Sequence, residues 1–215
     1  MDQASAENPH GPPPASFRGV DVAGWLGEGW RIFRTAPSAF VVSTAIILVV
    51  LLMAREFPLL FGLALRPLVL GFYLVVDDVA SGRPFGPSRL FKGFSWFFPC
   101  LAADLLITIF TTVGLVFLVI PGLVVASWYL FTWLFMMDRG LGFWGAMEAS
   151  RGVARNDMTG FFLFFLAIIF INVLGALCLV VGLFVSLPVS AASVYAAYRA
   201  SAGLKTMGAQ PERVI

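Results

Sequence analysis

Charged residues are scarce in this sequence. Only 12% of its 215 residues are Asp, Glu, Lys or Arg, and 60% are hydrophobic, whereas soluble domains are typically about a quarter charged. So few polar groups cannot cover the surface of a globular protein in water. The scarcity excludes an ordinary soluble domain and indicates a membrane protein. The net charge of +2 is too small to indicate a nucleic-acid partner.

Residue types that serve catalysis or metal binding are also scarce. The chain has one histidine, and neither of its two cysteines has a histidine beside it. Metal-ligand spacings, phosphate-binding loops and nucleophile-base pairs are not found. We therefore predict a protein that is not an enzyme, with no catalytic residue, no metal site and no cofactor. An intramembrane enzyme that uses Asp77 and Asp78 is less favoured, because neighbouring carboxylates on a helix point in different directions.

Three long stretches contain no Asp, Glu, Lys, Arg or His, namely 35–54, 105–137 and 158–198. About 20 apolar residues cross a bilayer, so the last two stretches are each long enough, or nearly so, for two crossings. With proline and glycine taken as breaks, the sequence predicts an all-α integral membrane protein with six transmembrane helices. Their ranges are 38–54, 58–76, 97–119, 121–137, 160–179 and 182–198.

Basic residues are concentrated in the segments that lie on one side of such a protein. The N-terminal region, the second and fourth connections and the C-terminal end hold 12 of the 14 Lys and Arg residues. Because basic segments are retained in the cytoplasm, we predict that both termini are cytoplasmic. A membrane domain at 18–203 is then flanked by a disordered tail at 1–17 and a C-terminal tail at 204–215.

The apolar stretches repeat with a period of about 60 residues. In the last two copies a glycine is followed seven or eight residues later by a second glycine, and then by a helix that ends in a basic residue. These residues are Gly114, Gly122 and Arg139 in one copy and Gly175, Gly182 and Arg199 in the other. A fainter first copy contains Gly62 and Pro67. The sequence therefore predicts three helical hairpins, with Cys100 and Cys178 too far apart to form a disulfide.

A short amphipathic segment precedes each hairpin. In "GFWGAMEASRGVAR", Glu148 and Arg151 lie on the helical face opposite Met147, and in "GWLGEGWRIFR", Glu28 and Arg31 lie opposite Trp25. The middle copy, "SRLFKGFSWFF", has basic residues among aromatics. We predict three short cytoplasmic interfacial helices with their aromatic faces toward the lipid. The candidate contacts to anionic headgroups or to a partner protein are Glu28, Arg31, Arg34, Lys92, Glu148, Arg151 and Arg155.

Three polar residues fall within the predicted transmembrane helices, and such residues are functional candidates because burying them is costly. Arg66 is expected to snorkel or pair, or alternatively to bind an anionic group. Asp104 is expected to lie near the cytoplasmic surface, hydrated or paired with an arginine of that side, or alternatively to relay protons or cations. Asn172 is expected to form an interhelical hydrogen bond, or alternatively to line a pathway.

The pattern of small and aromatic residues carries a resemblance. Its positions are Ile-Pro-Gly at 120–122, Trp128, Asp138, Arg139, Gly142, Trp144, Ala146, Ser150, Gly175, Gly182, Pro188 and Tyr198. Over about residues 20–203 the chain resembles a group of uncharacterised bacterial six-helix membrane proteins, similar to the membrane domain attached to some glycerophosphodiester phosphodiesterases. No catalytic domain of that enzyme is present. The resemblance implies a multi-pass protein of the bacterial inner membrane.

Two functions remain open at this point. The first is a non-enzymatic membrane protein that organises lipids or partner proteins, which the missing catalytic residues favour. The second is an oligomeric transporter or channel for a small solute or a lipid. Internal repeats, interrupted helices and Arg66 favour this second function. The expected partners are membrane lipids, with a membrane protein or a second copy of the chain as further candidates.

Overall fold

We describe the fold from a computed structural model, in which the described residues are 19–84, 86, 88–117, 119–178 and 181–204. Every regular element within these residues is a helix, so the predicted all-α class is confirmed. The predicted tail at 1–17 lies outside the described residues. So does the predicted C-terminal tail, apart from Leu204.

The helices fall into three consecutive units. The first unit contains α1 (Val22–Thr35), α2 (Pro37–Glu56) and α3 (Pro58–Ala80). The second contains α4 (Ser88–Phe91), η1 (Lys92–Trp96), α5 (Phe97–Phe117), α6 (Val119–Trp128) and α7 (Thr132–Arg139). The third contains α8 (Phe143–Ala154), η2 (Arg155–Asp157), α9 (Met158–Leu177) and α10 (Leu183–Ala202). All six predicted transmembrane segments are thus helical.

Local sequence signals start these helices. Asp21 caps α1, because its Oδ1 accepts a hydrogen bond from the Gly24 amide at 2.8 Å. Asp157 caps α9 in the same way. Pro37 and Pro58 occupy the first positions of α2 and α3, where a missing N–H costs nothing.

Glycines end the last helix of each unit. Gly82, Gly140 and Gly203 follow α3, α7 and α10 and have positive φ angles of 65°, 61° and 70°. This left-handed conformation is strained for residues with a side chain, so glycine is the residue that commonly ends a helix in this way. The same stop signal therefore recurs three times along the chain.

The predicted helix at 121–137 is interrupted. The backbone turns between α6 and α7, where the amides of Tyr129, Leu130 and Thr132 bond to carbonyls three residues earlier. The sequence here contains no proline or glycine, so the interruption was not predicted. Neither α6 nor α7 alone has the roughly 20 residues needed to cross a bilayer.

Three described segments are long and apolar enough to cross a membrane, namely Pro37–Glu56, Ser88–Gly114 and Phe143–Leu177. They indicate a membrane protein. The second and third segments include predicted interfacial helices. The structure therefore joins these short helices to the long helices that follow them, without an intervening loop.

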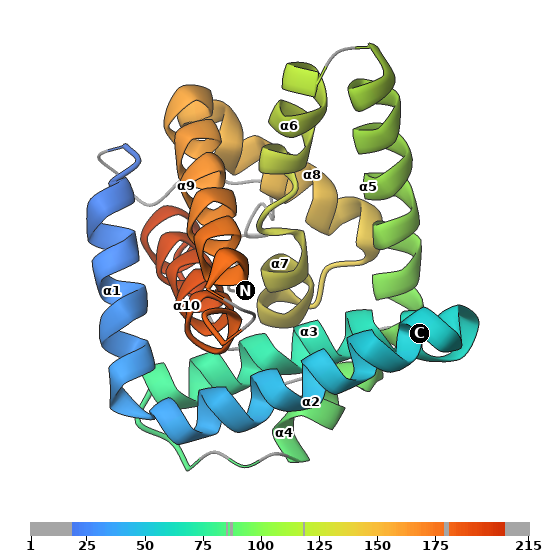
Figure 1. The fold of residues 1–215 in the computed structure, drawn as a ribbon. Coiled ribbons are helices and arrows are strands. Elements are labelled where there is room, and N and C mark those ends of the chain that lie inside the picture. The colour runs from blue at the N-terminus through green and yellow to red at the C-terminus, as the bar shows by residue number, and fades with distance from the viewer. Residues whose placement is uncertain (1–18, 85, 87, 118, 179–180, 205–215) are drawn as a thin grey trace, which may run out of the picture.

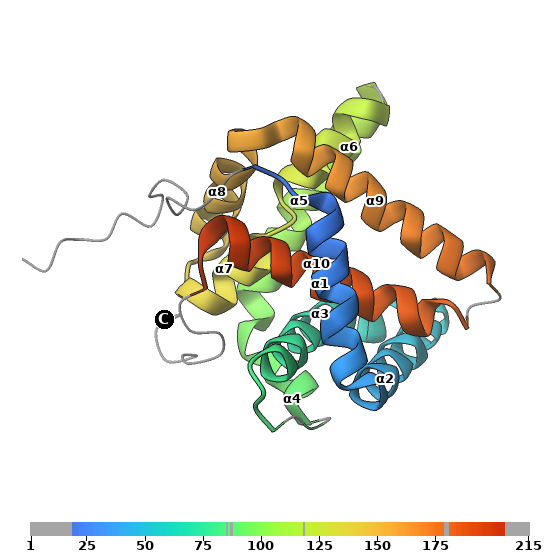
Figure 2. The same ribbon diagram turned by 90° about the vertical axis from the view of Figure 1, so that its left-hand side faces the viewer.

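Consecutive long helices pack in pairs: α2 on α3, α5 on α6, and α9 on α10. The pairs do not share one direction. In Figure 1, α2 and α3 run across the lower part of the molecule while α5 and α6 stand upright. In Figure 2, α10 crosses the centre of the molecule behind α1. The protein is therefore an assembly of three crossed helix pairs rather than a parallel bundle.

The short helices connect these pairs. Helices α4 and η1 pack on α3, α8 packs on α7, and α1 packs on α10. Each short helix thus contacts the final helix of the preceding unit, and α1 closes a ring by contacting the last unit. The Val20 amide strengthens this closure by donating to Asp157 Oδ2 at 3.0 Å.

This packing corrects the predicted orientation of the aromatic side chains in the first short helix. Trp25 and Phe33 were expected to face lipid, but they are buried in the protein. Trp25 packs edge-on against Phe164 of α9, with ring centroids 5.1 Å apart. The amphipathic pattern was read correctly, but its apolar face covers other helices. A different aromatic residue of α1, Trp30, is exposed.

Burial differs strongly between the two ends of each pair. Near the turn from the first helix to the second, apolar side chains are exposed: Leu52 is 64% exposed, Leu177 is 74% and Val181 is 71%. At the opposite end, side chains of α3, α7 and α10 contribute much of the core. Its fully buried members include Leu74, Leu134, Phe135, Tyr195 and Tyr198. The pairs therefore converge at one end and present apolar surface at the other.

Candidate functional site

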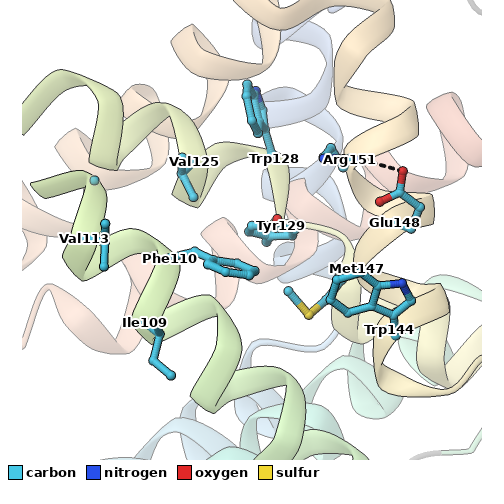
Figure 3. Close-up of a pocket in the computed structure, with 11 residues that line it drawn as sticks. Ile109, Phe110, Val113, Val125, Trp128, Tyr129, Trp144, Met147, Glu148 and Arg151 are labelled. Carbon is cyan, nitrogen blue, oxygen red and sulfur yellow. Dashed lines mark hydrogen bonds and ion pairs between the residues drawn. The ribbon is translucent and has the colours of Figure 1, made fainter.

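An open groove lies between the second helix pair and α8. Its volume is about 600 Å³, within the range of small-molecule sites. Its walls come from α5, α6 and α8, as Figure 3 shows. The lining residues are Ile109, Phe110, Val113, Gly114, Val125, Trp128, Tyr129, Trp144, Met147, Glu148 and Arg151. Most of these side chains are aliphatic or aromatic, so the groove suits an apolar ligand.

Ser150 of α8 holds the interrupted helix beside this groove. Its Oγ donates to the Trp128 carbonyl at 2.7 Å and accepts from the Phe131 amide at 3.1 Å. These bonds satisfy backbone groups that the interruption leaves unpaired. Because the interruption is fixed against α8, Trp128 and Tyr129 are held at the groove.

Charged groups lie at one end of the groove only. Arg151 Nη2 donates to Glu148 Oε1 at 2.6 Å, as the predicted spacing required, and this bond raises the pKa of Arg151. Two further donors belong to lining residues. Trp128 Nε1 and Arg151 Nε have no hydrogen-bond partner among the described residues. Both nitrogen atoms are buried, but the Arg151 side chain is 32% exposed, so the groove combines apolar walls with a guanidinium group that suits phosphate oxygens.

The two predicted polar residues of helices α3 and α5 meet in the structure. Arg66 Nε lies 3.1 Å from Asp104 Oδ1, so Arg66 is paired, as one of its expectations had it. Asp104 is paired with an arginine within α3, whereas an arginine from the cytoplasmic side had been expected. Asn172 lies elsewhere. Its Nδ2 donates to Ser190 Oγ on α10 at 2.7 Å, which confirms the expected interhelical hydrogen bond.

The remaining predicted contacts lie on the surface. Glu28 and Arg31 form the expected pair at 2.5 Å on α1, and the bond lowers the pKa of Glu28. Arg34, Lys92 and Arg155 are exposed. A role of these residues in binding headgroups or a partner stays a prediction.

Sequence reasoning missed a buried charged cluster at the convergent end. Asp77 and Asp78 at the end of α3 are 1% and 4% exposed. Asp78 pairs with Arg83 at 2.9 Å and with Arg89 at 2.6 Å, and Asp77 also pairs with Arg83. Burial opposes the charge of Arg83, but the two carboxylates outweigh it and raise its pKa.

Two tyrosines of α10 link the three units at this end. Tyr195 donates to Asp77 of α3 at 2.6 Å, and Tyr198 donates to Asp138 of α7 at 2.7 Å. A signal for these contacts was present: the first two predicted hairpins end in acidic residues, and the last helix of the third carries tyrosines. These bonds indicate a structural role for the buried aspartates. Among the described residues, no group of three His, Cys, Asp or Glu side chains is arranged to hold a metal.

Comparison with known proteins finds no matching family model, curated protein or solved structure. The resemblance to bacterial six-helix membrane proteins therefore stays a prediction. Function has to be argued from the side chains of the groove and of the cavities beside it.

Proposed function

We propose that the chain is a multi-pass protein of the bacterial inner membrane with six crossings, five formed by α2, α3, α5, α9 and α10 and one formed by α6 and α7 together. The exposed apolar ends of the pairs would face lipid and the far membrane surface. Exposed aromatics on the three short segments support an interfacial position, because such residues concentrate at headgroup level. They include Trp30, Phe94, Phe98 and Trp144. The basic residues near the convergent end support its assignment to the cytoplasm.

Within this arrangement, we propose a non-enzymatic role in which the protein binds a phospholipid of the cytoplasmic leaflet and so organises the surrounding lipid. The groove carries this proposal. Its aliphatic part, with Val113 and Val125, suits an acyl chain. Its other end holds Arg151 at the level of the exposed Trp144, where a phosphate would lie. The role requires no chemistry at Glu148, which only pairs with Arg151.

Replacement of Arg151 by glutamine is expected to weaken retention of the lipid. Loss of a charged donor to a phosphate should lower affinity by about tenfold. Native mass spectrometry of protein extracted gently from its own membrane should show one bound phospholipid on the wild type and much less on the variant.

The matched control is Arg31→Gln. Arg31 has the same spacing to its glutamate, but it lies on α1 away from the groove. The control should keep the lipid. Equal loss in both variants would contradict the groove and indicate a general effect of surface charge. No phospholipid on the wild type would contradict the proposed function itself.

A further inference from the structure

A second cavity lies on the other side of Tyr129, between α3, α5 and the interrupted helix. Its volume is about 370 Å³, and Tyr129 also lines the groove. It contains both members of an ion pair, Arg66 and Asp104, which come from two different helices, whereas the groove's pair, Glu148 and Arg151, lies on one helix. Neither is fully buried: the side chain of Arg66 is 47% exposed and that of Asp104 is 22% exposed.

A polar stripe on α5 forms one wall of this cavity. Asp104, Thr108, Thr111 and Thr112 all line it, and their spacing of four, three and one residues puts them on one helical face. The Oγ1 of Thr111 is buried and has no partner among the described residues. Hydroxyl groups beside an accessible ion pair indicate a hydrated cavity, because exposed charges are costly in hydrocarbon.

The depth of the ion pair argues against a lipid headgroup as its ligand. Arg66 is eight residues from the start of α3 and Asp104 is seven residues from the start of α5. At 1.5 Å per residue, both lie about 10–12 Å along their helices from the nearer end. A headgroup at the membrane surface would not reach them. A free solute that diffuses into a hydrated cavity would reach both charges.

The two charges define the chemistry of this solute. A simple anion at Arg66 would leave Asp104 without its partner, and a simple cation at Asp104 would leave Arg66 without one. A zwitterion with adjacent charges exchanges one ion pair for two, so neither Arg66 nor Asp104 is left without a partner. Apolar wall residues such as Val69, Ile107 and Leu130 would contact an uncharged substituent.

We propose that this cavity binds a small free zwitterion of the α-amino-acid type, with its carboxylate on Arg66 and its ammonium on Asp104. The site is separate from the groove, and its occupancy does not depend on the bound phospholipid.

Equilibrium dialysis of the full-length protein in lipid nanodiscs against a ¹⁴C-labelled mixture of L-amino acids tests this proposal. The wild type should retain label saturably. Arg66→Gln and Asp104→Asn should each lower its affinity by at least about tenfold, because each removes one charged partner. Arg66→Lys keeps the charge and should retain label even where Arg66→Gln fails to fold. Arg55→Gln, which changes an exposed arginine outside the cavity, is the control and should bind like the wild type.

Competition tests the requirement for both charges. Unlabelled L-leucine should displace the label. 4-Methylpentanoate, which lacks the ammonium group, and 3-methylbutylamine, which lacks the carboxylate, should not. The proposal is overturned if the wild type retains no saturable label. It is also overturned if either single-charge analogue competes as well as leucine, or if Arg66→Gln binds like the wild type.

Discussion

Gly71→Ala is expected to lower the free energy of unfolding by about 3 kcal/mol, the upper part of the usual range for overpacking. Gly71 lies in α3, where that helix meets α4 and η1. A Cβ at this position would overlap the carbonyl of Leu90, which is backbone and cannot move aside as a flexible side chain can. Gly93 makes the reciprocal approach to the carbonyl of Pro67. The substitution must therefore separate the two helices.

Gly62→Ala is the matched control on the same helix. Apart from its chain neighbours and the backbone of its own helix, no atom of the described residues lies within 4 Å of a Cβ built at Gly62. Alanine should therefore leave stability unchanged or raise it by up to about 1 kcal/mol through its better helix propensity. Reversible unfolding in mixed micelles measures both variants. Equal stabilities for the two variants would contradict the close contact between α3 and α4.

Asp78→Asn, at the convergent end of the helix pairs, is expected to lower the free energy of unfolding about as much as Gly71→Ala. The carboxylate is buried and pairs with both Arg83 and Arg89. Removal of one partner from a buried ion pair typically costs about 3–5 kcal/mol. We expect roughly 3 kcal/mol here, because the side chain of Arg83 is 46% exposed and remains paired with Asp77. Arg89 is 19% exposed and loses a charged partner.

Glu28→Gln is the control for this change. It also removes one carboxylate from an arginine, but the partner Arg31 is 65% exposed. Exposed pairs contribute only a few tenths of a kcal/mol. A loss of stability for Asp78→Asn no larger than that for Glu28→Gln would show that the buried cluster does not stabilise the contact between α3 and α4. The same unfolding measurement provides this comparison.

The sequence alone predicted the features that depend on local composition. Apolar runs and their breaks located six helical segments, and spacing predicted the Glu28–Arg31 and Glu148–Arg151 pairs. The cost of burying charge predicted that Arg66 would pair or snorkel. The sequence did not predict that Asp104 would be the partner of Arg66, because the two residues lie on helices from different units.

The sequence alone did not predict the features that depend on contacts between units. The interruption at Tyr129 has no local breaker and depends on Ser150, which lies more than 20 residues later. Asp77 was considered only as part of a less favoured enzyme site, but it is buried and accepts a hydrogen bond from Tyr195, 118 positions away. Likewise, an apolar face on a short helix does not reveal whether lipid or protein covers it. Trp25 is covered by protein.

The natural cysteines provide the most direct test of the proposed membrane arrangement. Cys178 is exposed at the end of α9, where the third pair turns, whereas Cys100 is buried. A membrane-impermeant maleimide added to intact spheroplasts should label the wild type, and Cys178→Ser should abolish the labelling. In the Cys178→Ser background, Ser81→Cys, at an exposed position beside Gly82, should react only after permeabilisation. Labelling of Ser81→Cys in intact spheroplasts, with Cys178 reacting only after permeabilisation, would contradict the arrangement.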